Sequence, residues 1–413
     1  MKCRHCASEL ELQLVDLGSA PPSNAYLTES ALKAPEKWFP LRVLVCQHCW
    51  LVQTEDFADA HELFGAEYAY FSGFSNSWLA HCERYAIDMI AALGLGADSH
   101  VVEVAANDGC LLQNFVARGI PCTGIEPTAS AAAAARARGI DVVEEFFGTR
   151  LAHELCEQGR QADLMTANNV LAHVPDINDF VAGFALLLKP DGVATFEFPH
   201  LVNLVAQNQF DTIYHEHFSY LSFTAATTIL GAAGLDVFDL RVLPTHGGSL
   251  RVFAQRGDAG RRPRNARVQE ILRMEGDAGV TTAGYYAGFQ AKAEKVKDDL
   301  VAFLIDAKRQ GLKMAGYGAA AKGNTLLNFA GVRPDLLPYI VDRNPVKQQK
   351  YLPGSRIPVV SEDALYAAKP DLILILPWNL KAEIEQQLSF VKAWGARLVT
   401  VIPSLEVEPH AHH

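Results

Sequence analysis

Residues 211–220, DTIYHEHFSY, gather several side chains that can do chemistry. Tyr214 supplies a phenol, Glu216 a carboxylate, and His217 an imidazole that can accept a proton near neutral pH. A general base, a donor to an oxyanion and an acid that orients the base therefore occur within four positions. The alternatives are a polar turn and a metal-binding fragment, but a catalytic zinc helix would need H-E-x-x-H, which this segment lacks.

A second group consists of cysteines in two C-x-x-C pairs, Cys3 with Cys6 and Cys46 with Cys49. Two such pairs in one short segment are typical of a closed, structural zinc site with four thiolate ligands. A redox motif or two chance pairs would not explain why both pairs lie in the same N-terminal segment. We expect the remaining single cysteines to be small core residues.

The scaffold for these groups starts in residues 101–126, VVEVAANDGCLLQNFVARGIPCTGIE. An apolar run containing Glu103 leads into a small-residue turn and a helix, and a second strand ends at Glu126. A ligand can approach the backbone of such a turn, and a carboxylate about 20 residues further on can accept hydrogen bonds from ribose hydroxyls. Because G-x-G-x-x-G is absent, the pattern favours S-adenosylmethionine (SAM) over a dinucleotide. The next strand, 162–167, runs into Asn168-Asn169-x-Leu171-x-His173.

Strands and helices alternate from Val101 onward, which predicts an α/β core with a parallel sheet. Helices are expected at 78–93, 110–118, 130–138, 149–158 and 179–189, a strand at 192–199, and an edge pair at 235–243 and 249–255. We interpret the polar stretch 257–264 as a domain boundary. A second Rossmann-like unit starts at Lys313, where a G-x-G-x-x-A match suggests NAD only weakly because it stands alone.

The composition limits which classes of protein this chain can belong to. The chain has 413 residues, of which 49% are hydrophobic and 20% charged, as expected for a globular protein of two to four domains. A net charge of −11 argues against a general nucleic-acid surface, which needs clustered Lys and Arg. No secretory leader pattern or membrane-length apolar run is seen, so we expect a cytoplasmic protein without a membrane partner.

Taken in order, these motifs resemble the sugar C-methyltransferases, which add a methyl branch to nucleotide-linked 4-keto-6-deoxy sugars and belong to the class I SAM-dependent methyltransferases. The resemblance covers nearly the whole chain and is carried by the cysteine pairs, Tyr68-Ala69-Tyr70-Phe71-Ser72, Asn107-Asp108-Gly109, Gly124-Ile125-Glu126-Pro127, Asn169-x-Leu171-x-His173, Glu216-His217, His246-Gly247-Gly248 and Tyr317-Gly318-Ala319-x-Ala321-Lys322. Two departures are visible: Ala105 replaces a usual Gly, and His215 occupies a position that often carries Asp.

The resemblance implies a zinc-binding domain (1–65), a SAM-dependent methyltransferase domain (66–262) and a C-terminal α/β domain (263–413) that holds the substrate's nucleotide, thymidine being usual. It implies three sets of site residues. The catalytic set is His217, Tyr214, Glu216, His173, Tyr68 and Tyr70. The cofactor set is Ala105, Asn107, Asp108, Gly109, Glu126, Asn168 and Asn169. The substrate set is Tyr317, Gly318, Lys322, Asn324 and His246.

In this interpretation His217 removes the proton next to the sugar ketone, Tyr214 stabilises the enolate oxygen, and Glu216 orients the imidazole. Lys322 would hold the diphosphate at a helix N-terminus. We expect a monomer or weak dimer whose partner is the small-molecule nucleotide sugar. The alternatives are an NAD-dependent nucleotide-sugar oxidoreductase or epimerase, a methyltransferase for another small molecule, and a zinc-ribbon interaction module with a degenerate methyltransferase domain.

Overall fold

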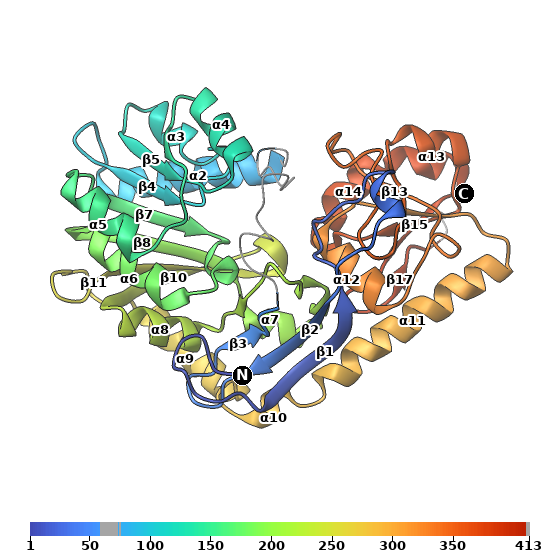
Figure 1. The fold of residues 1–413 in the computed structure, drawn as a ribbon, viewed down its shortest axis with the longest axis horizontal. Helices are drawn as coiled ribbons and strands as arrows, with labels where there is room; N and C mark the ends of the chain where they lie inside the picture. Colours follow the sequence, from blue (N-terminus) through green and yellow to red (C-terminus); the bar gives the residue numbers. More distant parts are fainter. Residues whose placement is uncertain (58–72, 74–75, 410–413) are drawn as a thin grey trace.

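The fold was obtained as a computed structural model that describes residues 1–57, 73 and 76–409. These described residues form sheets of four, seven and six strands. Figure 1 shows the seven-stranded sheet and its helices in one lobe and the six-stranded sheet in the other, with β1 and β2 reaching between them. The predicted architecture, an N-terminal metal-binding part and two α/β parts, is confirmed.

The N-terminal sheet has the strand order β1-β2-β3-β9 and is antiparallel throughout. Its last strand, β9, comes from the middle of the chain and pairs Tyr220 with Val52. The segment before residue 65 therefore does not complete its own sheet. The elements are β1 (Leu12–Ala20), η1 (Ala31–Lys33), β2 (Phe39–Val45), β3 (Val52–Thr54) and β9 (Ser219–Tyr220).

The middle sheet has the order β10-β11-β8-β7-β4-β5-β6. Strands β6, β5, β4, β7 and β8 are parallel, and β11 and β10 add an antiparallel edge. All residues of β4 are buried, as expected for a central parallel strand, whereas β10 at the edge is only partly buried. The strands are β4 (Val101–Val104), β5 (Cys122–Ile125), β6 (Asp141–Val143), β7 (Ala162–Asn168), β8 (Leu188–Pro199), β10 (Leu235–Leu243) and β11 (Ser249–Arg256).

Helices and short 3-10 turns connect these strands. The helices are α2 (Asn76–Leu93), α3 (Gln113–Val116), α4 (Ala129–Ala137), α5 (Thr149–Glu157), α6 (Ile177–Leu187), α7 (Leu201–Ala206) and α8 (Phe223–Ala232). The 3-10 turns are η3 (Leu171–His173), η4 (Phe210–Thr212) and η5 (Thr245–Gly247). The two that carry His173 and His246 follow β7 and β10, and η4 leads into the segment with His217. All three candidate imidazoles thus lie in connections, which are the usual location of functional residues.

The C-terminal sheet has the order β14-β13-β12-β15-β16-β17, with only β17 antiparallel. Its strands are β12 (Met314–Tyr317), β13 (Ile340–Val341), β14 (Val359–Val360), β15 (Leu372–Ile375), β16 (Arg397–Thr400) and β17 (Glu406–Val407). Its helices and 3-10 turns are α12 (Ala321–Phe329), α13 (Asp363–Ala368), η6 (Trp378–Leu380), α14 (Lys381–Gln387) and η7 (Ser389–Trp394).

Three helices link the lobes: α9 (Ala266–Ala278), α10 (Ala283–Tyr286) and α11 (Phe289–Arg309). Figure 1 shows α11 running under the C-terminal lobe toward β1. Helix α9 packs against α8 and β10 of the middle part, where buried Glu275 accepts from the main-chain N–H groups of Phe223 and Thr224, each at 2.7 Å. The boundaries at 65 and 262 stay predictions. No helix among the described residues is long and apolar enough to cross a bilayer.

Candidate active site and metal centre

The two cysteine pairs form matching loops. Ala7 and Trp50, each four residues after the first cysteine of its pair, have positive φ and donate to that cysteine's carbonyl at 2.9 Å. The sulfur atoms of Cys3 and Cys49 are 3.5 Å apart, those of Cys6 and Cys46 are also 3.5 Å apart, and all of them lie within 4.8 Å of one another. Zn–S bonds of about 2.3 Å in a tetrahedron put thiolates about 3.8 Å apart. The four cysteines therefore fit a structural zinc ion.

The turn after β4 is shaped by backbone conformations that few residues adopt. Ala105, Asn107 and Gly109 have φ of 55°, 48° and 76°. A Cβ on Gly109 would lie 2.3 Å from Ile140, so this position requires glycine. Glu126 holds the turn: its carboxylate accepts from the N–H groups of Asn107 at 2.9 Å and Thr128 at 2.8 Å. The turn and Glu126 adjoin each other, and the hydrogen bonds of Glu126 to ribose hydroxyls stay a prediction.

Acidic side chains line this turn. Glu103, Asp108 and Glu126 are all buried, and burial raises the pKa of Glu103 well above its usual value. One carboxylate oxygen of Glu103 and one of Asp108 are buried without a hydrogen bond among the described residues. Buried acceptors of this kind need a donor. Ribose hydroxyls and an ammonium group supply such donors, so these residues fit SAM.

The functional side chains in residues 211–220 differ in burial. Tyr214 and His217 are half-buried, whereas His215 and Glu216 are buried. The Nδ1 atom of His217 lies 2.8 Å from the carbonyl oxygen of Thr212. Because a carbonyl can only accept, Nδ1 of the neutral ring carries the proton and Nε2 carries the lone pair. His217 is therefore oriented as a base.

Two rings pack on His217. The Tyr214 ring is 3.9 Å away between centroids and the His173 ring is 4.6 Å away, edge-on. Burial lowers the pKa of His217 well below its usual value, and it lowers the pKa of His173 to about 4. Both imidazoles are neutral at pH 7. The structure brings Tyr214, His173 and His217 together as predicted; Tyr68 and Tyr70 lie outside the described residues.

Glu216 does not make the expected contact with the imidazole of His217. Its Oε1 atom instead accepts from the main-chain N–H and the side-chain amide of Asn24, at 3.2 and 3.1 Å. The Thr212 carbonyl orients the ring in its place. His215 also turns toward the N-terminal part, with Nε2 at 3.3 Å from the carbonyl of Phe39. These two side chains connect the catalytic segment to the N-terminal domain.

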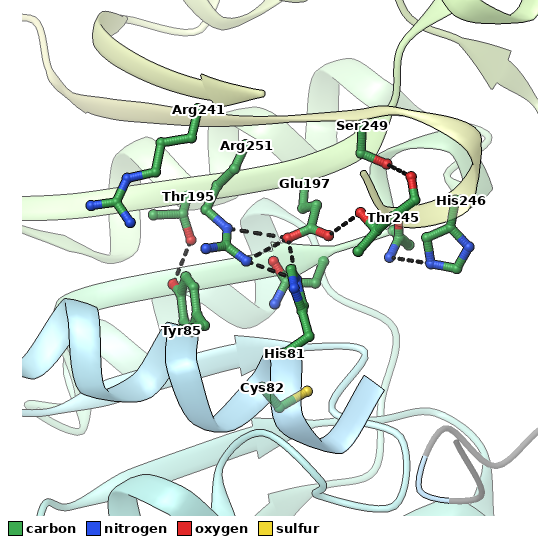
Figure 2. A network of polar contacts seen from close by, with 12 residues as sticks. His81, Cys82, Tyr85, Thr195, Glu197, Arg241, Thr245, His246, Ser249 and Arg251 are labelled. Carbon is green, nitrogen blue, oxygen red and sulfur yellow. Dashed lines mark hydrogen bonds and ion pairs between the residues drawn. The ribbon is translucent and has the colours of Figure 1, made fainter. Parts of the chain in front are cut away.

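His246 is held in a loop that a buried polar network fixes. Figure 2 shows Glu197 among Arg251, His81 and Thr245, with His246 next along the loop. The Glu197 carboxylate accepts from Arg251 Nη2 at 2.7 Å and from the Thr245 hydroxyl at 3.1 Å. Burial alone would raise the pKa of Glu197, but His81 and Arg251 outweigh it and hold that pKa below its usual value. Sequence reasoning missed this network, because its members come from α2, β8, β11 and η5.

The side chain of His246 contacts the residues that follow β7. Its Nε2 accepts from the Asn169 side-chain amide at 3.2 Å, and Asn169 has a φ of 58°. Asn168 lies at the end of β7, where its side-chain oxygen accepts from Thr166 at 3.3 Å. The predicted cofactor residue Asn169 and the predicted substrate residue His246 are thus neighbours.

The other predicted substrate residues lie around α12 and do not converge on one point. Gly318 has a φ of 86°, and a Cβ there would lie 2.5 Å from Pro377. The Tyr317 hydroxyl donates to Glu362 at 2.8 Å, and the buried Asn324 donates to the Ser23 carbonyl at 2.6 Å. The Nζ atom of Lys322 donates to a different group, the side-chain oxygen of Asn379, at 2.9 Å.

Comparisons with known proteins agree with this arrangement. Residues 3–64 match the family described as "Putative zinc binding domain", residues 78–240 the "Methyltransferase domain", and residues 244–403 the "C-methyltransferase C-terminal domain". The C-methyltransferase NovU of Streptomyces niveus is 33% identical over 98% of this chain and 96% of its own length.

More distant proteins match smaller parts of the chain. The ubiquinone biosynthesis O-methyltransferase of Bordetella avium is 32% identical over 23% of this chain and 41% of its own. The magnesium protoporphyrin IX methyltransferase of Synechocystis, solved with bound SAH, is 14% identical over 43% of this chain and 83% of its own, with a TM-score of 0.35. A structural likeness this weak carries no conclusion. The full-length match is sufficient by itself: the chain belongs to the C-methyltransferase family, as its motifs predicted.

Proposed function

We propose that this protein uses SAM to methylate a carbon atom of a nucleotide-linked 4-keto-6-deoxy sugar, at carbon 3 and with thymidine as the nucleotide. The observation that supports it most directly is His217. A neutral imidazole with its Nδ1 proton held by the Thr212 carbonyl presents Nε2 as a base. Methylation of a carbon beside a ketone needs such a base, because that carbon must first lose a proton.

A ring carbon beside a ketone can lose a proton when the enolate is stabilised. His217 would take that proton, and a positioned base contributes about 10²–10⁴-fold. Tyr214, packed on the base, would donate to the enolate oxygen. SAM supplies the methyl group when it is bound. Asn107, Asp108 and Glu126 are the residues that would hold it, with Ala105 and Gly109 shaping their turn.

The C-terminal unit supports a nucleotide as the other end of the substrate. Asp342 accepts from the N–H of Ala319 at 2.7 Å and from the N–H of Asn344 at 2.8 Å. This repeats the way in which Glu126 holds the turn after β4. A second turn of the same design suits a second ligand, which we infer is the sugar's nucleotide. The motif that suggested NAD is explained equally well by this ligand.

The test is a methyl-transfer assay with isotopically labelled SAM and a panel of acceptors. We expect transfer to a thymidine diphosphate 4-keto-6-deoxy sugar and none to the 4-hydroxy analogue, because the alcohol cannot form an enolate. RNA should accept no label, and NAD should not change the melting temperature, whereas SAM should raise it. Transfer to the 4-hydroxy sugar would contradict the enolate route, and transfer to RNA alone would contradict the substrate class.

A further inference from the structure

Lys322 lies in the first turn of helix α12 in the C-terminal lobe, and this helix packs against η4, the turn just before Tyr214 in the middle lobe. Three residues along the same helix face, Thr325 donates its hydroxyl to the Ile213 carbonyl at 2.7 Å. This bond fixes α12 against the residues directly before Tyr214. The position of Lys322 is therefore set by the catalytic segment and not only by the turn at Gly318.

The ammonium group of Lys322 has few protein partners for a charge in this location. Its Nζ donates to Asn379 at 2.9 Å and lies 4.8 Å from the Trp378 ring centroid. Trp378 in turn donates to the buried Asp211 at 2.7 Å, one residue before Thr212, whose carbonyl orients His217. Burial lowers the pKa of His217 and of His246, and the charge of Lys322 adds to both shifts. Lys322 therefore acts electrostatically on two of the neutral imidazoles.

Lys322 is half-buried, like Tyr214, His217 and His246. Asp211, one residue before Thr212, is fully buried. A developing negative charge beside His217 would meet this ammonium group in a poorly solvated location, where such pairs are strong.

We propose that Lys322 is a catalytic residue that stabilises the enolate oxygen, and that it does not bind the diphosphate. The inference rests on the proposed function. When His217 Nε2 takes the proton from the carbon beside the ketone, the C–H electron pair moves into the new carbon–carbon double bond and the carbonyl π pair moves onto oxygen. The ammonium group of Lys322 keeps its protons and donates a hydrogen bond to that oxygen. Asp211 balances the charge of Lys322 while the site is empty.

The test separates this role from diphosphate binding and from a structural role. Lys322→Met should lower kcat by about 10²–10³-fold, the loss typical of a removed oxyanion donor, with the affinities for thymidine diphosphate and SAH within about threefold of wild type. Solvent deuterium exchange of the substrate proton, measured with SAH bound, should slow in parallel. Lys313→Met, at an exposed position directly before β12, is the matched control and should keep wild-type values.

Other outcomes would overturn the proposal. A tenfold or greater loss of thymidine diphosphate affinity with little change in kcat would assign Lys322 to the diphosphate. A lower melting temperature with unchanged kcat would make it structural. If Lys322→Met does not fold, Lys322→Ala assayed with added ethylammonium chloride should recover part of kcat, and sodium chloride at equal ionic strength should not; no recovery would contradict the role. If instead the wild-type enzyme does not methylate the keto sugar, the proposed function itself is wrong.

Discussion

The turn after β4 and the turn after β12 share one design and differ in charge. In both, a carboxylate at the end of the second strand accepts from a turn amide and from the amide two residues beyond itself: Glu126 in the first turn, Asp342 in the second. The first turn is lined by the acids Glu103 and Asp108. Beside the second, Lys347 donates to the carbonyl of Ala319 at 2.8 Å.

That difference in charge suggests which ligand each turn receives. SAM carries a sulfonium cation and an ammonium group, which suit acidic surroundings, and a nucleoside diphosphate is an anion, which suits a cation such as Lys347. The same strand-turn-helix unit therefore serves opposite ligands through a few side chains. Burial lowers the pKa values of His173, His217 and His246, so these imidazoles add no positive charge at neutral pH. In the proposed function, His217 supplies the proton chemistry.

Removing the zinc site should have the largest effect, because the N-terminal segment touches both units. Tyr26 donates to the Ala319 carbonyl at 2.5 Å, and Asn24 contacts Glu216. Cys46→Ser should reduce the bound metal from about one equivalent and lower the melting temperature, and it should weaken both ligands together. Metal analysis and calorimetry measure this. Cys156→Ser, at a half-buried single cysteine, is the control. Well-folded protein without zinc would reject the site.

Replacing the proposed base, His217, should strongly reduce methyl transfer and leave the affinities for both ligands nearly unchanged. His217→Asn should lower kcat by about 10²–10⁴-fold, because the lone pair that takes the proton is lost. Exchange of the substrate proton with deuterium oxide in the presence of SAH should disappear. Calorimetry with SAH and thymidine diphosphate should give near wild-type affinities. Methylation at the wild-type rate would exclude His217 and direct attention to His173.

Replacing each of the two acids in turn tests whether the two turns bind different ligands. Glu126→Ala should weaken SAH by about 10²-fold, since a charged acceptor is lost, and leave thymidine diphosphate nearly unchanged. Asp342→Ala should show the reverse pattern. Glu144→Ala, at an exposed position after β6, is the control for the first variant. Equal losses of affinity for both ligands in either variant would contradict the assignment of one ligand to each unit.

Local sequence patterns predicted the elements well where the pattern itself fixes the structure. Strand β10 spans the predicted 235–243, because alternating apolar residues end at Pro244 and a glycine-rich turn. The helix expected at 110–118 is shorter, Gln113–Val116, since residues after Gly109 continue as turns. Pairing of β9 with β3 joins residues far apart in the chain, and no local pattern signals it.

The same limit applies to the site. Spacing selected His217, Tyr214 and Glu126 as candidates, because the motifs that contain them lie within one unit. It did not identify Glu197 with Arg251 and His81, because these residues meet only when four elements pack. It predicts that Lys322 holds the diphosphate, since a lysine after a glycine turn usually faces that turn's ligand. The packing of α12 on η4, which no local pattern signals, is what suggests the other role proposed for Lys322.

The change of kcat with pH should be the smallest of these effects, and it tests directly whether the charge of Lys322 in the C-terminal unit is required. Burial lowers the pKa of Lys322 to about 8, although Asp211 opposes the shift, and His217 and His246 are the other ionisable groups near it. If the ammonium form is required, kcat should fall as pH rises through about 8, because deprotonation removes the charge, and by up to tenfold per unit beyond. His217 stays neutral far below pH 6.5, so the rate should not drop between pH 7 and 6.5 through this group. In Lys322→Arg the alkaline fall should vanish, since guanidinium keeps its proton. An unchanged alkaline fall in that variant would show that another group causes it.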